Sequence, residues 1–207
     1  MFITFEGIDA SGKTTQLKFL EEKLKKAGMD VISTRQPGGT RIGQLIREIL
    51  LNPENTEMVS ITEVLLYMAD RIQHIKQIIL PALEKKQIVL CDRYHDATLA
   101  YQGGGRELDL SWLKMLQDDH VLTPDLTLWF DISLEESQKR LQQRNILNDE
   151  ENCRLESESA DFFSRVRQSY QDLCIKNSTR YVQIPADGTI ESIEKEVTQI
   201  IKAKIGF

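Results

Sequence analysis

The sequence predicts an α/β fold in which helices cover both faces of a five-stranded parallel sheet. Two observations support this fold class. Apolar runs of strand length alternate with stretches of helical period, and this order favours parallel strands joined by right-handed crossover helices. The first expected strand also leads directly into a glycine-rich loop that opens a helix. The 207 residues suit a single domain, 1–207, which at this length buries roughly 70% of its unfolded surface.

Each expected strand is a short apolar run, and the five runs are 2–6, 30–35, 87–92, 125–132 and 180–185. The expected helices follow a period near 3.6 residues and cover 14–28, part of 38–52, 60–83 and 189–205. Ser60 and Glu63 form a capping box at the start of the longest helix, and Ser133 and Glu136 form a second box. Pro81 is expected to kink or end the longest helix.

One polar stretch, 145–159, interrupts this pattern and is expected to be a mobile loop between two helices. Two interpretations remain open. The stretch is either a solvated linker or part of a catalytic lid that covers 140–159. A lid that closes would exclude water from a reaction site.

Composition excludes several classes of function. The formal net charge of −6 argues against a nucleic-acid polymer as partner, since such binding needs a basic surface. No run approaches ~18 apolar residues, so no membrane helix is expected, and the start of the chain lacks the features of a signal peptide. Cys91, Cys153 and Cys174 form no CxxC pair, which is typical of incidental thiols rather than zinc ligands. The cytoplasm is the expected location.

The segment GIDASGKT matches G-x-x-x-x-G-K-[ST] between an expected strand and an expected helix. Its glycines let backbone N–H groups face an anion, and the helix that follows points its positive end at the same place. Lys13 is expected to reach the outer phosphates of a triphosphate, and Thr14 to hold Mg²⁺. The predicted nucleotide-binding loop consists of Gly7, Ile8, Asp9, Ala10, Ser11, Gly12, Lys13 and Thr14.

Asp9 is unusual because a carboxylate inside such a loop would repel a triphosphate. It either faces water or faces the acceptor of the phosphate, where it accepts a hydrogen bond from a hydroxyl group. The second interpretation is favoured, because a polar group near the site should have a partner.

Asp92 and Arg93 end a buried apolar strand next to the expected loop. A carboxylate in this place orients Mg²⁺, directly or through water. The Arg93 guanidinium suits a phosphate group. A surface salt bridge is the alternative for the pair, and the crevice at the ends of parallel strands makes it less favoured.

Six segments, in this order, make the chain resemble the thymidylate kinases, which convert dTMP and ATP to dTDP and ADP. They are EGIDASGKTTQ, TRQPGGT, LLYMADR, CDRYHDATLAYQGGGR, PDLTLWFD and CRLESESADFFSRV. Together they span nearly the whole chain and are far more specific than a phosphate loop alone. The resemblance implies a P-loop kinase fold with a small lid, ATP and dTMP as substrates in dTTP biosynthesis, magnesium as cofactor, and a homodimer.

The resemblance also implies roles for residues of the dTMP site. Tyr67 takes the position that stacks on the thymine ring. Arg71, four residues later on the same helix face, takes the position that donates to a carbonyl oxygen of the base. Thr98 and Gln102 match positions that contact the base. Tyr101 matches an aromatic residue that favours deoxyribose.

Other positions match the groups that bind the phosphate and sugar. Arg93 and Arg35 match residues that bind the monophosphate, and Arg47 is a weaker candidate. Asp9 matches a carboxylate that receives the 3′-hydroxyl. These correspondences add a second line of support for the interpretation of Asp9 as facing the acceptor.

The phosphate loop has no arginine or lysine at its variable positions, whereas the expected lid carries Arg140, Arg144 and Arg154. This is the lid-arginine pattern of many bacterial members of the family. Arg144 and Arg154 are therefore expected to have catalytic roles beside Lys13, Asp92 and Arg93, with Arg154 moving in when the lid closes. A lid that contributes no arginine is the alternative.

Three departures from the family pattern concern Gln36, Ala97 and Cys153, which replace residues that are commonly Glu, Ser and Asp. None lies in the phosphate loop. Two other functions were weighed against dTMP phosphorylation. A kinase for another deoxynucleoside monophosphate is disfavoured by Tyr67 and Arg71, and a guanine-nucleotide switch by the lack of an Asn-Lys-x-Asp run.

Overall fold

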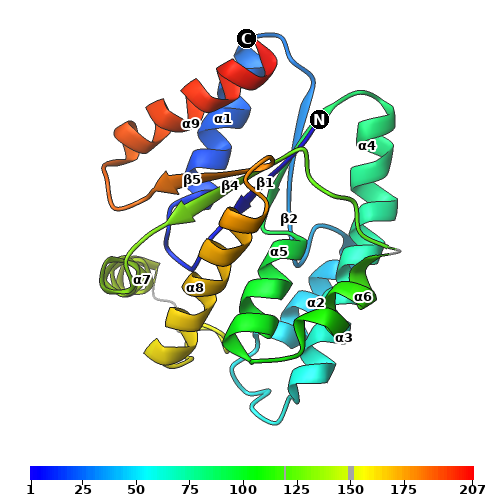
Figure 1. Ribbon diagram of the computed structural model, residues 1–207, viewed down its shortest axis with the longest axis vertical. Helices are drawn as coiled ribbons and strands as arrows, with labels where there is room; N and C mark the ends of the chain where they lie inside the picture. Colours follow the sequence, from blue (N-terminus) through cyan, green and yellow to red (C-terminus); the bar gives the residue numbers. More distant parts are fainter. Residues whose placement is uncertain (119, 149–151) are drawn as a thin grey trace.

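The computed structural model describes residues 1–118, 120–148 and 152–207 (Figure 1). Within them, five strands form one sheet in the order β2-β3-β1-β4-β5, and every pair of neighbours is parallel. The predicted α/β class and parallel sheet are confirmed, and each strand lies within its predicted range. The strands are β1 (Phe2–Glu6), β2 (Val31–Arg35), β3 (Ile88–Asp92), β4 (Leu126–Asp131) and β5 (Tyr181–Pro185).

Helices cover both faces of this sheet. Alternate residues of β1 point to opposite faces, and apolar residues on both faces pack against helices. Ile3 packs in a core cluster with Leu20 of α1 and Val197 of α9, whereas Phe2 packs with Ile79. Figure 1 shows α1 and α9 side by side. The helices are α1 (Lys13–Lys26), α2 (Arg41–Leu51), α3 (Ser60–His74), α4 (Leu80–Glu84), α5 (His95–Thr98), α6 (Leu110–Asp118), α7 (Leu134–Asn148), α8 (Ala160–Lys176) and α9 (Ile190–Ile205), with π-helical segments η1 (Ile75–Ile79) and η2 (Leu99–Gly105).

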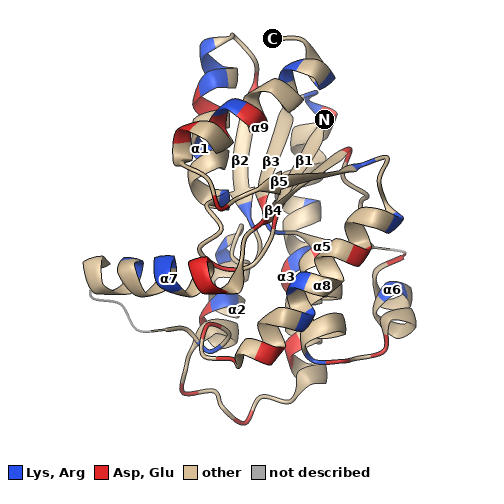
Figure 2. Cartoon of the chain, turned by 60° about the vertical axis from the view of Figure 1, so that its left-hand side comes forward, with Lys and Arg blue, Asp and Glu red and all other residues tan. Residues whose placement is uncertain are grey.

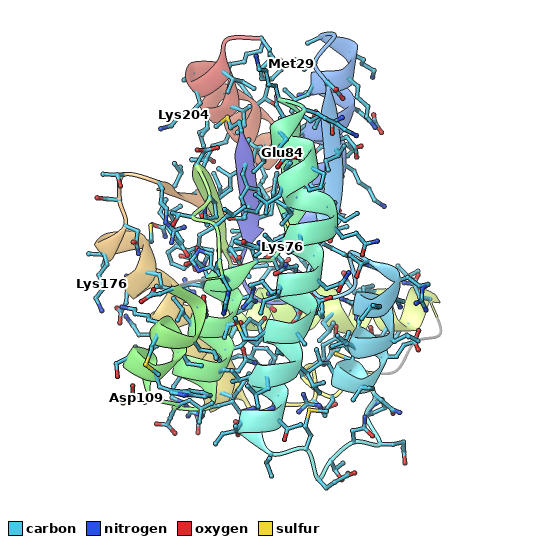
Figure 3. All side chains as sticks on the ribbon, turned by 90° about the vertical axis from the view of Figure 1, so that its right-hand side faces the viewer. Met29, Lys76, Glu84, Asp109, Lys176 and Lys204 are labelled. Atoms are coloured by element: carbon cyan, nitrogen blue, oxygen red, sulfur yellow. The ribbon has the colours of Figure 1, made fainter. Side chains whose placement is uncertain are left out.

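The longest helical column consists of α3, η1 and α4 (Figure 3). The column continues to Glu84, so the predicted end of the helix at Pro81 is wrong. A proline lacks an N–H and crowds the carbonyl of the preceding turn. Here the wider π-helical turn comes directly before it, where the Leu80 N–H bonds to the Ile75 carbonyl. The helix therefore passes through the proline.

One predicted capping box is wrong and the other is half formed. Val59, not Ser60, caps α3, and the Glu63 side chain turns into the protein and binds other residues. At the start of α7, Ser133 Oγ accepts from the Glu136 N–H at 3.3 Å, but the Glu136 carboxylate pairs with Arg140 instead of returning to the cap. In both cases the glutamate pairs with arginine side chains instead of bonding to the N–H of the cap residue.

The polar stretch begins later than predicted. Residues 145–148 continue α7, although Ile146 and Leu147 are exposed, so local helix propensity rather than burial carries the helix this far. Of the predicted lid, 149–151 lie outside the described residues. No helix of the described chain combines the length and apolar character that a membrane crossing requires.

Candidate active site

The loop between β1 and α1 has the backbone geometry of a phosphate-binding loop. Gly7 and Gly12 have φ angles of 139° and 88°, which side chains other than glycine rarely allow. A Cβ at Gly7 would also lie 2.5 Å from the Phe130 carbonyl oxygen. Lys13 is buried, and its Nζ donates to the Ile8 carbonyl at 2.7 Å. The loop backbone therefore curves around an ammonium group.

This loop lines a cleft of about 620 Å³ at the carboxyl ends of the strands. The cleft suits a polyanion, because basic side chains from several segments converge on it. They are Lys13, Arg35, Arg47, Arg93, Arg140 and Arg144. The segment Gly188–Ile190, at the start of α9, forms part of the wall, and no motif in the sequence had indicated it.

Thr14 and Asp92 bring two oxygen-bearing side chains together in this cleft. The Thr14 hydroxyl donates to Asp92 Oδ2, and both residues line the cavity. Hydroxyl and carboxylate oxygens suit Mg²⁺, which commonly takes its other ligands from water and substrate phosphates. In the part of the chain that the structure describes, no three His, Cys, Asp or Glu side chains gather into a metal cluster. The donor set therefore fits a nucleotide-bound cation.

A second, narrower cavity of about 100 Å³ adjoins the cleft. Nearly all the residues predicted for the dTMP site line it, and Arg35 is the exception because it lines only the larger cleft. The three residues at which the sequence departs from the family pattern also lie in its wall, namely Gln36, Ala97 and Cys153. The predicted residues in the wall are Asp9, Arg47, Tyr67, Arg71, Arg93, Thr98, Tyr101 and Gln102.

Arg71 is buried, and its guanidinium is held from several sides. Its Nε donates to Gln36 Oε1 at 3.0 Å, and its Nη2 donates to Thr98 Oγ1 at 2.9 Å and to the Tyr94 carbonyl at 3.2 Å. The amide of Gln36 lies 2.8 Å from His74 Nδ1. Burial lowers the pKa of Arg71, but a guanidinium remains charged at neutral pH. The cavity thus contains a fixed, oriented cation.

The two cavities meet at residues that line both of them. This shared wall consists of Asp9, Gln36, Arg47, Arg93 and Glu156. A ligand in the narrow cavity and a ligand in the cleft would therefore approach each other here, beside the guanidinium groups of Arg47 and Arg93.

Arg93 is a residue of this shared wall and contacts the phosphate loop. Its φ of 65° is uncommon for a residue other than glycine and is typical of strained functional sites. Its Nη1 donates to the Gly7 carbonyl and its Nη2 to Asp9 Oδ1, both at 2.6 Å. The Tyr101 hydroxyl donates to the other Asp9 oxygen at 3.2 Å. Burial alone would raise the pKa of Asp9, but the Arg93 guanidinium lowers it overall, so the pair is ionic.

Comparisons with known proteins bear on the chemistry of this paired site. A model of the thymidylate kinase family matches residues 5–197. This chain belongs to the thymidylate kinase family. Thymidylate kinases from Exiguobacterium sp. and Maridesulfovibrio salexigens are 46% and 45% identical to it, over 95% and 99% of this chain and 92% and 94% of theirs. The crystal structure of thymidylate kinase from Ehrlichia chaffeensis matches with a TM-score of 0.78 at 34% identity, covering 98% of each chain.

The structure separates the three arginines that the thymidylate kinase pattern suggested for the lid. Arg140 and Arg144 line the phosphate-loop cleft. Arg154 lines neither cavity: its Nε donates to the Leu50 carbonyl at 2.9 Å and its Nη2 to Glu63 Oε2 at 2.5 Å. Its expected contact with the phosphates on lid closure stays a prediction, because in this conformation the buried Glu63 carboxylate binds it outside both cavities.

Other residues of this thymidylate kinase site had no assigned role. Gln36 was noted only as a replacement, yet it orients Arg71 and lines both cavities. Glu156 follows Arg154 in a family segment, and its position in the shared wall was not predicted. Glu63 was interpreted as a cap. Cys153 contacts the cavity as a neutral thiol, since burial raises its pKa to about 11.

Proposed function

We propose that this chain transfers the γ-phosphate of ATP to dTMP, giving ADP and dTDP. The observation that carries the proposal is the junction of two cavities at Arg93 and Asp9. One cavity is bounded by a phosphate loop and the other by Tyr67 and Arg71. Membership of the thymidylate kinase family supports the choice of substrates.

In this proposal ATP occupies the larger cleft. Residues 7–14 surround its phosphates with backbone N–H groups, and Lys13 contacts the outer phosphates. Arg140 and Arg144 add charge from α7. Thr14 and Asp92 would hold Mg²⁺, which neutralises phosphate charge when it is bound. The adjacent oxygens of these two residues support this assignment.

The narrow cavity holds dTMP. Tyr67 stacks on the thymine ring, an interaction worth about 1–3 kcal/mol, while Thr98 and Gln102 contact its edge. Arg71 donates to a base carbonyl, where cytosine would present an amino group instead. Tyr101 and Asp9 border the deoxyribose. Arg35, Arg47 and Arg93 bind the monophosphate at the side that faces ATP.

The reaction needs little acid–base catalysis. The nucleophile is a phosphate oxygen that already carries charge near pH 7, because the second pKa of a phosphate monoester is ~6. The barrier lies in bringing two polyanions together and in stabilising the charge on the transferred group. Lys13, Arg93 and the arginines of α7 meet both needs, since all of them line the cleft proposed for ATP and Arg93 also borders the narrow cavity.

A steady-state assay over several acceptors tests this function. Purified protein with Mg²⁺ and ATP is given dTMP, dUMP, dCMP or dGMP, and ADP release is measured by a coupled enzyme assay. dTMP is expected to be the best acceptor and dCMP a poor one, because Arg71 opposes the cytosine amino group. A preference for dCMP or dGMP would favour a different deoxynucleotide kinase, and no turnover with any acceptor would refute the proposal.

We also propose a homodimer, formed through the face of α2 and α3. These helices pack together and expose apolar side chains at helical spacing, namely Ile42, Leu45, Ile49, Ile61 and Leu65. An apolar patch rimmed by polar residues is typical of an interface, and a second copy is the occupant that the family suggests. Light scattering should give a dimer mass that Leu45→Glu with Leu65→Glu reduces to a monomer mass. The control is Leu147→Glu, an exposed apolar residue on α7.

Two further assignments complete the proposal. Residues 140–159 form a lid segment within one domain, 1–207. The protein acts in the cytoplasm, where ATP is supplied and where a reducing environment keeps cysteines such as Cys91, Cys153 and Cys174 as free thiols.

A further inference from the structure

Glu63 is a buried carboxylate that joins three separate parts of the chain. Its side chain is 1% exposed. Oε1 accepts from Gln102 Nε2 at 2.8 Å, and Arg106 donates to both carboxylate oxygens at 3.2 to 3.3 Å. Arg154 Nη2 donates to Oε2 at 2.5 Å. Burial alone would raise the pKa of Glu63, but these hydrogen bonds lower it overall, so the group is ionised.

On one side, Glu63 controls a residue of the dTMP cavity. A carboxylate only accepts hydrogen bonds, so the Gln102 amide must present Nε2 to Glu63 and turn Oε1 the other way. Gln102 lines the cavity. Loss of the carboxylate would therefore release the orientation of an amide that is proposed to contact the base.

On the other side, Glu63 holds the segment 152–158, which we name the arm. The Arg154 backbone N–H and its Nε bond to the last carbonyls of α2, at Leu51 and Leu50. A cation is favoured at a helix C-terminus. Figure 2 shows the chain passing the end of α2 between α7 and α8. Among the described residues, Glu63 is the carboxylate that pairs with this arginine.

The arm reaches both cavities. Cys153 and Leu155, on either side of Arg154, line the narrow cavity. Glu156 lines both cavities and accepts from Arg144 at 2.9 Å. Arg144 in turn lines the phosphate-loop cleft. A continuous set of contacts thus runs from Gln102 through Glu63 and the arm to Arg144 in the phosphate-loop cleft.

We infer that Glu63 is a positioning residue that couples dTMP binding to the placement of the arm and, through Glu156, of Arg144. This inference rests on the proposed function. dTMP contacting Gln102, Cys153 and Leu155 stabilises the arrangement that Glu63 holds, and that arrangement places Arg144 beside ATP. Because coupling between two ligands is reciprocal, a bound ATP analogue should lower the Kd of dTMP, by about 5- to 150-fold on the usual scale of such effects.

The test compares wild type with Glu63→Gln, which keeps the shape of the side chain and removes its charge. Calorimetry measures the Kd of dTMP with and without a non-hydrolysable ATP analogue and Mg²⁺. Glu63→Gln should abolish the tightening, raise the dTMP KM several-fold and lower kcat. Hydrogen exchange of the arm should be slowed by dTMP alone in wild type and not in the variant.

Glu158→Gln is the matched control. Glu158 contacts Arg106 at 2.6 Å from the arm itself, but it lines neither cavity and leaves the Glu63 contacts in place. It should retain the tightening and the dTMP-dependent protection. If Glu63→Gln does not fold, Arg154→Met carries the same test, because it cuts the connection on the arm side.

The outcomes separate this inference from the function. Wild-type protein that makes no dTDP would refute the proposed function. Wild-type protein that makes dTDP, together with a folded Glu63→Gln variant that retains the tightening and the arm protection, would refute the coupling alone. A variant with a lower Tm but unchanged KM, kcat and coupling would show that Glu63 is only structural.

Discussion

The phosphate-loop cleft and the narrow cavity, which we propose for dTMP, are built in different ways. The cleft takes a large part of its wall from one contiguous segment, 9–16, and its arginines come from α2, α7 and the ends of β2 and β3. The cavity consists of side chains from distant segments that hold one another, as Gln36, Thr98 and Arg71 do. Backbone groups dominate the first region and a side-chain network the second.

Because of this difference, the two regions are sensitive to different mutations. A loop of backbone N–H groups tolerates most side-chain changes, so its weakness is concentrated in a residue such as Lys13. A buried network loses several contacts when any member is removed, because the remaining polar groups stay unpaired. Mutations in the cleft should therefore change the rate of transfer, whereas mutations in the cavity should change the affinity for dTMP.

The largest effect is expected for Lys13→Ala. Loss of the ammonium group removes a charge that stabilises the transferred phosphate, so kcat should fall by at least about 10³-fold. The fold should persist, as judged by circular dichroism and by dTMP affinity. Lys18→Ala, an exposed lysine on α1, serves as control. Near-normal turnover of Lys13→Ala would remove this residue from the reaction.

The sequence predicted the contiguous phosphate loop better than the side-chain network. The loop and its flanking strand and helix were predicted because glycines, lysine and threonine at fixed spacing determine local backbone geometry. Tyr67 and Arg71 were predicted because they share a helix face and fit a family segment. These signals are short-range. The five strands were located by another short-range signal, the apolar runs.

Long-range pairs were not predictable in the same way. Glu63 and Arg154 are 91 positions apart, and no local pattern connects them. The sequence around Glu63 instead suggested a helix cap, and the arginine-rich lid suggested a phosphate contact for Arg154. The cap is the wrong interpretation, because a buried carboxylate selects its partners in three dimensions, whereas the phosphate contact of Arg154 stays a prediction.

The next largest effect is expected for Arg71→Met, which keeps much of the side-chain volume and removes the hydrogen bonds. A buried charged donor is worth about 1.5–3 kcal/mol, so the dTMP KM should rise about 10- to 100-fold. The ATP KM should change little, because Arg71 does not line the cleft. Arg41→Met, exposed at the start of α2, is the control. Equal losses for both substrates would contradict the separation of the two regions.

The pH dependence of kcat/KM for ATP tests the charge state of Lys13 in the cleft. Burial, assisted by the Arg93 charge, lowers the pKa of Lys13 to about 8 in the free protein. Below this pH the amine is protonated and binds phosphate, and above it the charge is lost. Because kcat/KM reports the ionisation of the free enzyme, kcat/KM for ATP should fall up to about tenfold per unit above pH 8. Lys13→Arg, whose side chain stays charged, should show a lower value without this decline. A decline of the same size in both proteins would assign it to another group.

The smallest effect is expected for Gln36→Leu. This variant tests whether Gln36 only assists Arg71 or is required to orient its guanidinium. The amide accepts from Arg71 Nε and contacts His74, so its loss leaves a buried guanidinium N–H unpaired at a cost of about 1 kcal/mol. The dTMP KM should therefore rise only about fivefold, with kcat unchanged. Gln77→Leu, an exposed residue of η1, controls for the loss of an amide. A much larger rise, approaching that of Arg71→Met, would mean that Arg71 works only when Gln36 holds it, and that orientation rather than charge makes the cavity selective.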